Sequence, residues 1–421
     1  MTNTPPAQTL PRQPWMAAPA LQAVMSALAA AGGDDCARFV GGCVRNAIMR
    51  RPVADIDIAT TLTPAEVQAA LALARLKCVP TGISHGTVTA ISNGVPFEIT
   101  TLRRDVSTDG RHATVAFTDD WSQDAARRDF RFNALYADTS GGLFDPTGEG
   151  LGDAAAGRVV FVGDPGARIE EDYLRILRFF RFHAWYGASE PDSAALSACA
   201  ALKTGIKTLS GERIAKELLT LLAADDPRAS VRLMAATGVL GEVLPGAGSL
   251  GRFEKLVSIE TEMLFTCDAE LRLAALLPDD QDVARAVAAT LRLSNVQRER
   301  LCAALNPQLS LQSWMSPREA RRYVYRLGAP AFCDRVMLQW AASDRPAATI
   351  QWRALLPLAQ SWPVPTLPLA GEEVVAAGVP RGPMVGAVLR EVESWWIEND
   401  FIDDRLSIVE RLKSVVTGMV Y

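Results

Sequence analysis

Two aspartates separated by one residue are the first feature of this chain that could do chemistry. Asp55 and Asp57 alternate with isoleucines in the run DIDI. Residues i and i+2 of a β-strand lie on the same side, so we expect both carboxylates to share one face. Neighbouring carboxylates repel each other unless a cation lies between them, so the pair suits a hard divalent ion such as Mg²⁺. A polar strand face is the alternative, and the pattern alone does not exclude it.

A pair of glycines precedes the aspartates. Gly41 and Gly42 follow an apolar, strand-like run, and Arg45 comes shortly after them. Glycines let a ligand approach the backbone closely, free N–H groups at the start of a helix attract phosphate, and an arginine adds a charge-assisted donor. An ordinary tight turn is the alternative. Because Asp55 follows after one predicted helix and a short loop, we expect this turn to hold a triphosphate beside the metal pair.

Two arginine-rich segments follow. The first, Arg127-Arg128-Asp129, comes near the end of the β-rich part and on its own could be a solvated loop. In the second, Arg175, Arg178 and Arg181 recur every three residues after Asp172. On one helix such a row winds as a ridge, and Asp172 and Arg175 are neighbours at i and i+3. A surface ion pair opposite a Leu/Phe core face is the alternative for this helix.

The elements that position these residues change character near residue 150. Before it, short runs of alternating apolar residues separated by glycines and polar turns predict strands, and 44–51 and 64–75 are predicted helices. Thr63 and Glu66 form a capping box at the start of the second helix. After about residue 165, helical patterns punctuated by Gly and Pro predominate. The expected fold class is α+β, a small head with a mixed β-sheet followed by an all-α neck, body and tail.

Composition narrows the function classes. With 421 residues the chain is too long for one compact core, which predicts two to four domains, and because 49% of its residues are hydrophobic we expect most of it to fold. No apolar run reaches about 18 residues, so we expect no membrane span. Residues 16–31 faintly resemble a secretory signal, but Gln22 and Ser26 interrupt the run, and we expect a first amphipathic helix there. The net charge of −5 means that a nucleic-acid partner needs a local basic face.

Cysteine and histidine usage excludes two further kinds of site. The seven cysteines are scattered without a CxxC pair, which argues against a disulfide framework and a zinc site and favours a reducing, cytoplasmic location. The three histidines are isolated, so they cannot form the His-Asp cluster of a metal-dependent phosphohydrolase.

The ordered set of motifs resembles a known family. GGCVR, DID, RRDFRFNA, DPTGEGLGD and EEDYLRILRFFRF, followed by SGERIAKELL at 210–219, are similar to motifs of the class II tRNA nucleotidyltransferase and bacterial poly(A) polymerase family. Members of this family add CCA, or single nucleotides, to RNA 3′ ends. The resemblance covers about residues 38–220, and beyond it only residues 378–396 are similar to the C-terminal regions of some members.

The resemblance implies roles for individual residues. Asp55 and Asp57 match the metal-binding pair and imply two Mg²⁺ ions. Gly42 and Arg45 match positions that grip the triphosphate, and Arg128 matches an arginine that contacts the nucleotide. The residues that match the neck motif, which selects and orients the base, are Asp172, Arg175, Arg178 and Arg181.

Three positions qualify this picture. Asn46 stands where many members have Asp, which removes one charge near the phosphate grip, and Arg131 stands where many have Thr. Glu98 is a candidate third carboxylate. Neither Asn46 nor Arg131 belongs to the metal pair, so these two departures bear on how the substrate is bound rather than on the family resemblance.

Base selection follows from hydrogen-bond polarity. Cytosine and adenine present an amino donor beside a ring-nitrogen acceptor, and uracil and guanine present the reverse. An Asp172 acceptor next to an Arg175 donor complements C and A, and a good bidentate pair discriminates by roughly 1–3 kcal/mol. The expected substrates are therefore CTP and ATP, added without a nucleic-acid template.

The expected macromolecular partner is tRNA. We expect four parts: 1–35, a flexible start and first helix; 36–150, the nucleotidyltransferase head; 151–225, the neck with the base-selecting motif; and 226–421, an RNA-binding helical body and tail. The local basic runs that could contact phosphate are Lys203, Lys207, Arg298, Arg300, Arg318, Arg321, Arg322 and Arg326. A solvated face is the alternative for each run.

Other activities remain open at this stage. A poly(A) polymerase, or an enzyme that adds only CC or only A, has the same motifs. A catalytically silent RNA-binding relative is a further alternative, and the intact DxD, GGxVR and EDxxR motifs argue against it.

Overall fold

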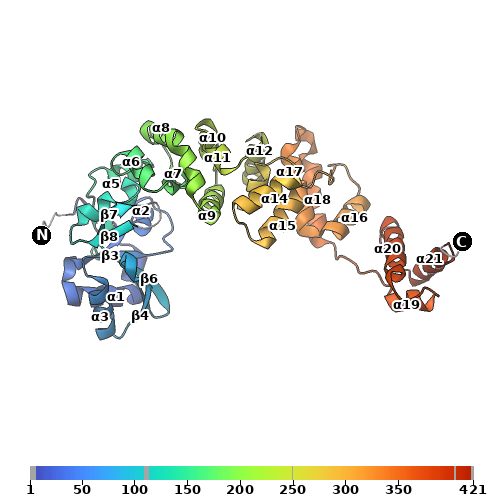
Figure 1. Ribbon diagram of the computed structural model, residues 1–421, viewed down its shortest axis with the longest axis horizontal. Coiled ribbons are helices and arrows are strands. Elements are labelled where there is room, and N and C mark those ends of the chain that lie inside the picture. Colours follow the sequence, from blue (N-terminus) through green and yellow to red (C-terminus); the bar gives the residue numbers. More distant parts are fainter. Residues whose placement is uncertain (1–5, 109–112, 249, 403, 419–421) are drawn as a thin grey trace. The chain divides into compact units, whose positions relative to one another are not determined.

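A computed structural model describes residues 6–108, 113–248, 250–402 and 404–418. The chain divides into two compact units, Met1–Pro245 and Gly246–Tyr421. In the first unit a β-sheet is followed by helices, and the described part of the second unit is helical (Figure 1). The predicted α+β fold class is confirmed.

The sheet of the first unit is mixed, with strand order β1-β10-β9-β2-β3-β6-β5-β4. Its strands are β1 (Gln8–Thr9), β2 (Ala37–Val40), β3 (Asp57–Thr60), β4 (Lys77–Gly82), β5 (Thr87–Ser92), β6 (Val95–Thr101), β9 (Tyr136–Ala137) and β10 (Gly142–Phe144). β3 and β6 run parallel, and the other paired strands run antiparallel. A separate hairpin follows, formed by β7 (Arg103–Thr108) and β8 (Ala113–Phe117).

Short helices cover this sheet. The helix α1 (Pro19–Gly32) occupies the segment that faintly resembled a secretory signal, and its Leu21 and Val24 are fully buried. The helix α2 (Gly42–Ile48) follows β2 directly, and α3 (Pro64–Leu73) follows β3. The predicted capping box of α3 is present, because Thr63 and Glu66 each accept a backbone N–H of the other.

The expectation of a flexible start is wrong for residues 6–18. The short strand β1 pairs with β10, and Leu10 and Met16 are buried. Trp15 packs edge-on against Phe39, with 5.0 Å between ring centroids. The segment folds onto the sheet because these three apolar side chains bury there, despite the surrounding prolines. Residues 1–5 lie outside the described residues.

The head passes into the neck within one compact unit. The helices of this part are α4 (Trp121–Ala126), α5 (Gly150–Ala156), α6 (Pro165–Glu171), α7 (Leu174–Tyr186), α8 (Ser193–Leu202), α9 (Gly211–Leu222), α10 (Arg228–Ala236) and α11 (Val239–Val243). An aromatic cluster joins the end of the head to α7, since Phe130 lies 4.7 Å from Phe161 and 5.2 Å from Phe182 between ring centroids. Such buried ring pairs add to the apolar burial that fixes α7 against the head.

The second unit is built from helices alone among its described residues. They are α12 (Leu250–Glu262), α13 (Ala269–Ala275), α14 (Gln281–Thr290), α15 (Asn295–Ala304), α16 (Pro317–Leu327), α17 (Ala329–Ala342), α18 (Thr349–Ser361), α19 (Gly371–Ala376), α20 (Pro383–Glu398) and α21 (Arg405–Gly418). The last three share a core that includes Val388, Trp396 and Leu412. The boundary between the two compact units follows α11, whereas we expected the neck to end after α9. The division of the chain into four parts remains a prediction.

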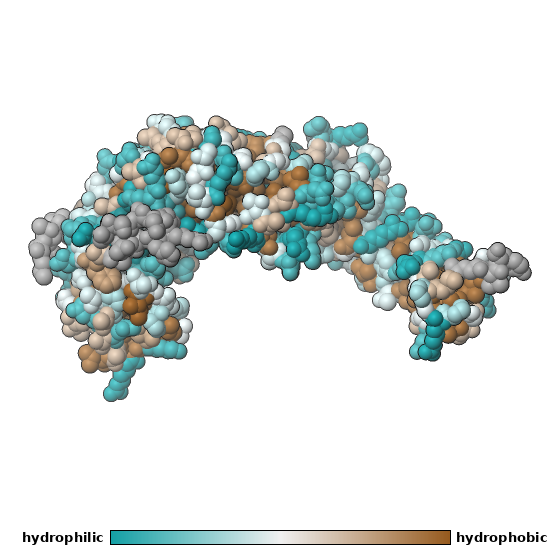
Figure 2. Space-filling model, viewed as in Figure 1, coloured by the Kyte–Doolittle hydropathy of each residue, from teal (hydrophilic) through white to brown (hydrophobic). Residues whose placement is uncertain are grey.

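The described helices include none that is long and apolar enough to cross a membrane. On the face seen in Figure 2, hydrophilic and weakly polar residues predominate, and apolar residues occur in separate patches.

Candidate active site

The carboxylates of the DIDI run lie where two parallel strands meet. Asp57 begins β3 and pairs in register with Glu98 of β6. Asp55 precedes the strand, so the expectation that both aspartates belong to one strand is wrong for Asp55, although its charge still acts on Asp57. The ladder ends there because β2 reaches only Val40, opposite Asp57, before the chain turns away at Gly41.

These carboxylates lack a cationic partner. Asp55, Asp57 and Glu98 form no hydrogen bond or ion pair through their carboxylates within the described part of the chain. Desolvation raises the pKa of Asp57, the negative charges of Glu98 and Asp55 raise it further, and Arg128 opposes them. A site short of positive charge suits a bound cation, and carboxylate oxygens are the ligands that Mg²⁺ prefers.

The three carboxylates interact without forming a complete site. Among the residues that the structure describes, no group of three or more His, Cys, Asp or Glu side chains is arranged to hold a metal ion. Asp55 and Asp57 are exposed, as residues that receive a ligand must be. The place of Glu98 as a third ligand stays a prediction.

The glycine turn brings backbone close to an arginine. Gly41 has φ 71° and ψ −123°, a conformation that residues with a Cβ rarely adopt. A Cβ at Gly41 would lie 3.8 Å from Nη1 of Arg128, so the turn and this guanidinium face each other. Gly42 begins α2, and its contact with the triphosphate stays a prediction.

Arg128 is oriented by a buried carboxylate that the motif analysis missed. Asp124 of α4 accepts from Nε and Nη2 of Arg128 at 3.1 and 2.9 Å, and from the hydroxyl of Tyr136 at 2.7 Å. Arg127 also pairs with it. Burial raises the pKa of Asp124, but these donors outweigh it and lower the pKa to about 2; in return Tyr136 and Asp124 raise the pKa of Arg128, which keeps it charged. The i, i+4 spacing of Asp124 and Arg128 is the pattern that could have identified the pair.

Arg45 lies deeper than expected. It is only 6% exposed, and its guanidinium donates to Asn133 at 2.6 Å, to Asn46 at 2.9 and 3.1 Å, and to the hydroxyl of Tyr186 at 2.7 Å. It also lies 4.0 Å from the centroid of the Tyr186 ring. These bonds tie α2 to the end of α7 and use four of the five N–H groups of the guanidinium. The proposed grip by Arg45 stays a prediction.

Asn46 has a defined place beside Arg45. Its Oδ1 accepts from Arg45, and its Nδ2 donates to the carbonyl of Pro52 at 2.8 Å. An aspartate has no donor, so it could not make the second bond. The residue that departs from the family pattern therefore connects α2 to the loop that leads to Asp55.

The expected helix from Glu171 through α7 is interrupted. α6 ends at Glu171, Asp172 has extended backbone at φ −156° and ψ 105°, and α7 begins at Leu174. Asp172 and Arg175 therefore do not form the expected i, i+3 pair of one helix. Asp172 instead accepts from the N–H of Leu174 at 3.1 Å and from Nη2 of Arg213 at 2.7 Å.

The three neck arginines have different partners. Arg175 pairs with Glu171, and Arg178 bonds to Asp129 through Nε at 2.8 Å. Arg181 pairs with Glu217 of α9, which also lies 3.7 Å from Arg178. The buried Asp129 has its pKa lowered to about 2, with Arg178 as the strongest opponent of desolvation. The arginines are thus held by carboxylates on the head, on α6 and on α9.

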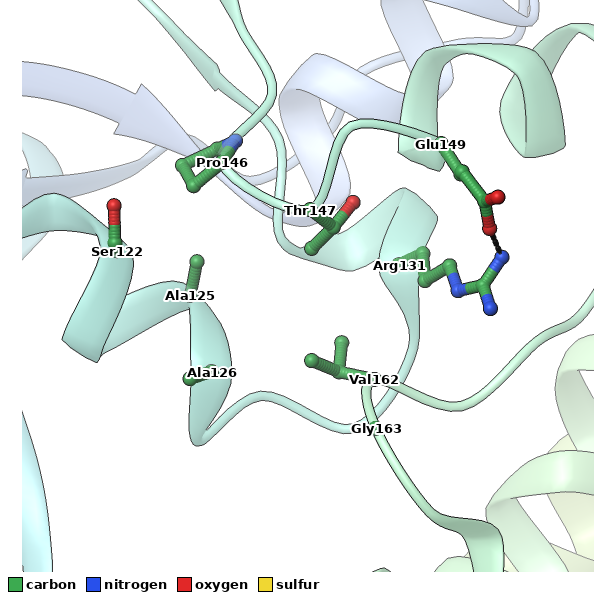
Figure 3. A pocket seen from close by; sticks show the side chains of 9 residues that line it. All are labelled: Ser122, Ala125, Ala126, Arg131, Pro146, Thr147, Glu149, Val162 and Gly163. Atoms are coloured by element: carbon green, nitrogen blue, oxygen red, sulfur yellow. Dashed lines mark hydrogen bonds and ion pairs between the residues drawn. The ribbon is translucent and has the colours of Figure 1, made fainter.

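A small pocket lies beside this cluster rather than at the carboxylates. Its volume is about 230 Å³, and Figure 3 shows Arg131 and Glu149 joined at its rim. Its walls are formed by Ser122, Ala125, Ala126, Arg131, Pro146, Thr147, Glu149, Val162 and Gly163. None of the residues predicted to bind metal or nucleotide lines it, although Arg131, which departs from the family pattern, does.

Two family models match the first unit. The model described as "Poly A polymerase head domain" matches residues 37–160, and "Probable RNA and SrmB- binding site of polymerase A" matches residues 190–249. The first match spans the carboxylates, the glycine turn and Arg128.

Curated relatives extend over most of the chain. A mouse protein named "CCA tRNA nucleotidyltransferase 1, mitochondrial" is 33% identical over 391 residues, which cover 89% of this chain and 86% of the relative. The CCA-adding enzyme of Limosilactobacillus fermentum is 30% identical over 395 residues, with coverage of 92% and 94%.

Solved structures share the fold. The CCA-adding enzyme of Bacillus stearothermophilus, solved with CTP, gives a TM-score of 0.76 at 24% identity and covers 96% of this chain and 99% of its own. The Thermotoga maritima enzyme, solved with tRNA, gives 0.67 at 18% identity, with coverage of 97% and 96%. Nucleotidyltransferases of this kind depend on divalent metal ions. With these relatives matched along nearly its whole length, the chain belongs to the CCA tRNA nucleotidyltransferase family.

Proposed function

We propose that this protein adds C and A from CTP and ATP to the 3′ end of tRNA. The observation that carries the proposal is the set of carboxylates without ion-pair partners around Asp57, which interacts electrostatically with Asp55, Glu98 and Arg128, while Arg128 lies at the Gly41 turn. A nucleotidyl transfer site needs acidic metal ligands next to a cationic cradle for a triphosphate. The named relatives, matched over most of their length, support the same activity.

Asp55 and Asp57 would hold the divalent ions, two Mg²⁺ in our proposal. When bound, such ions activate the attacking 3′ oxygen and stabilise the leaving pyrophosphate. The chain's own contribution is to keep these carboxylates exposed and free of competing ion pairs. No histidine base is required, because the bound ions would activate the 3′ hydroxyl that attacks the α-phosphate.

Arg128 supplies fixed positive charge beside the turn. Asp124 and Tyr136 engage its Nε, and Asp124 also engages Nη2. The remaining nitrogen, Nη1, faces Gly41, where the absence of a Cβ leaves room for a phosphate oxygen. Preorganised donors of this kind stabilise developing charge without rearranging during the reaction.

Asp172 and Arg175 would select the base, as the family motif implies. Arg213 holds Asp172 in the break between α6 and α7, and Glu171 holds Arg175. Because Arg213 occupies Oδ2 and the Leu174 N–H occupies Oδ1, each oxygen keeps one further lone pair for the amino group of C or A. The acceptor is thus already fixed before a nucleotide binds.

The proposal also covers the location of the protein and the unit that binds tRNA. We place the protein in the cytoplasm, which the seven free cysteines support and which fractionation followed by immunoblotting tests. We place part of the tRNA on the second unit. In its basic runs Arg300 is bound by Asp268, Glu270 and Asp334, whereas Arg298 and Arg326 have no partner among the described residues.

The decisive experiment uses a tRNA transcript that lacks its 3′-terminal CCA. The purified protein is incubated with each labelled nucleotide separately and with CTP and ATP together. We expect two C residues from CTP alone and a complete CCA end from the mixture. Addition of CC only, of A only, or of a long A tail would assign the chain to one of the narrower or alternative activities. No incorporation by the folded protein would refute the proposal.

A further inference from the structure

We propose that the turn Arg50-Arg51 binds phosphates of the RNA strand that ends at the reacting 3′ hydroxyl. This turn connects α2 to the loop that carries Asp55. The inference rests on the proposed function, because it assigns part of the RNA contact at the same site.

The turn presents two exposed cations. Arg50 is exposed, and its side chain has no partner within the described part of the chain. Arg51 is exposed too, and its guanidinium lies 5.0 Å from the centroid of the Tyr186 ring. A cation–π contact of this kind restrains a side chain without neutralising its charge. The turn therefore keeps its positive charge available to a ligand.

The backbone of the turn is held in place from within. The N–H of Arg50 donates to the carbonyl of Ala47 at 3.3 Å, and that of Arg51 donates to Asn46 at 2.8 Å. The side chain of Asn46 adds its bond to the carbonyl of Pro52. Because the same amide also accepts from the buried Arg45, the turn is anchored to the core of the first unit. A preorganised cationic turn loses little entropy when it binds.

Most of the other basic runs of the chain are already neutralised or occupied. In the second unit Arg321 pairs with Asp400, and Arg318 and Arg322 donate to carbonyls at the end of α20. In the first unit Lys207 pairs with Glu242, and Lys203 donates to a carbonyl. Since the protein as a whole carries a charge of −5, phosphate binding depends on cations that, like Arg50, have no carboxylate partner among the described residues.

The turn lies within reach of the reacting end. Asp55 follows Arg50 by five positions along the sequence, which limits their Cα separation to about 18 Å. A strand whose 3′ end reacts at Asp55 therefore passes its last few phosphates near the turn. The triphosphate of the incoming nucleotide has the same chemistry, so the experiment must distinguish the two sources of phosphate.

The chain offers a matched control at Arg75. Arg50 has φ 54° and follows α2, and Arg75 has φ 56° and follows α3. Each donates its N–H to a carbonyl three residues earlier, and each side chain is exposed and without a partner among the described residues. Substitution of either one by Gln removes one charge at the same backbone conformation, but only Arg50 is close in sequence to the carboxylates.

The test compares Arg50→Gln, Arg75→Gln and Arg50→Lys with the unmodified protein. The affinity for a tRNA transcript lacking CCA is measured between 50 and 200 mM salt, and the KM for CTP is measured separately. Loss of one phosphate contact makes the slope of log affinity against log salt shallower by about 0.7–0.9. When the salt rises from 50 to 200 mM, the affinity of Arg50→Gln therefore falls by a factor that is about three times smaller than the factor for the unmodified protein. We expect Arg75→Gln and Arg50→Lys to keep the original slope, and the KM for CTP to stay unchanged in all three variants.

Two results would overturn the inference. One is an equal salt slope for Arg50→Gln and Arg75→Gln, which would show that Arg50 contacts no RNA phosphate. The other is a raised KM for CTP with an unaltered RNA slope in Arg50→Gln, which would assign the turn to the triphosphate. Failure of the unmodified protein to extend the transcript would instead count against the proposed function itself.

Discussion

At the residue scale, two arginines of this site are held by buried carboxylates. Asp124 fixes Arg128, and Asp129 fixes Arg178. Both carboxylates are buried, and their arginine partners keep their pKa values near 2. Each guanidinium is therefore aimed before a substrate arrives, and the site does not have to reorganise its charges during nucleotidyl transfer.

The first residue to test is Asp57. Asp57→Asn keeps the shape of the side chain and removes its charge, so we expect incorporation of C and A to fall by about 10²–10³-fold. The fold should persist, because this carboxylate makes no hydrogen bond among the described residues and its pKa is raised in the folded state. Asp119→Asn, at another exposed aspartate without a partner among those residues, is the control. Primer-extension rates and melting temperatures decide, and a folded Asp57→Asn variant with normal turnover would refute the metal assignment.

Asp172 is the residue for base choice. Asp172→Ala removes the acceptor for the amino group of C and A, and it also frees Arg213 to donate to the carbonyls of U or G. We expect the preference for CTP and ATP over UTP and GTP to shrink by roughly 1–3 kcal/mol in the ratio of kcat/KM values. Measuring all four nucleotides on one primer provides this ratio. An unchanged ratio in the folded variant would mean that the base is recognised elsewhere.

At the element scale, the sequence predicted the strands, most helices and the order of the motifs. Local patterns were sufficient there, as in the capping box at Thr63 and Glu66. The break at Asp172 was missed because residues 170–186 have an unbroken helical pattern, whereas Arg213 and Gly205, far along the chain, stabilise the extended backbone. The burial of Arg45 was missed for a similar reason, since its partners Asn133 and Tyr186 come from remote elements.

The packing of this break makes a prediction about Gly205. A Cβ there would overlap the ring of Tyr173, which lies between α6 and α7. We expect Gly205→Ala to displace the ring and destabilise the protein by about 1–3 kcal/mol. Because Asp172 immediately precedes Tyr173 in the sequence, we also expect the preference for C and A to weaken. Gly241→Ala is the control, since a Cβ at Gly241 meets no atom within 4 Å. Denaturant unfolding and nucleotide preference are measured for both, and equal behaviour would show that the ring contact does not support the break.

At the scale of the whole molecule, the positive charges serve two different purposes. The chain is acidic overall, and many of its arginines pair with carboxylates inside each unit. This pairing stabilises the helical packing and neutralises the arginines that take part in it. The consequence is that RNA affinity depends on the exposed cations outside these pairs, whereas stability depends on ionised carboxylates in the interior.

The stability of the first unit should therefore depend on pH in a defined window. Asp124 and Asp129 have folded-state pKa values of about 2, below the ordinary value of 3.8. A depressed pKa stabilises the fold above the unfolded value, and this contribution is lost as the pH falls from about 4 to 2, by roughly 2 kcal/mol for each carboxyl. Asp57 acts in the opposite sense, since its raised pKa makes protonation favourable to the fold. We expect the free energy of unfolding, followed by denaturant titration at pH 5, 4 and 3, to fall with pH. In Asp124→Asn this fall should be smaller, because one of the two linked carboxyls is gone, and an identical pH dependence would refute the assignment.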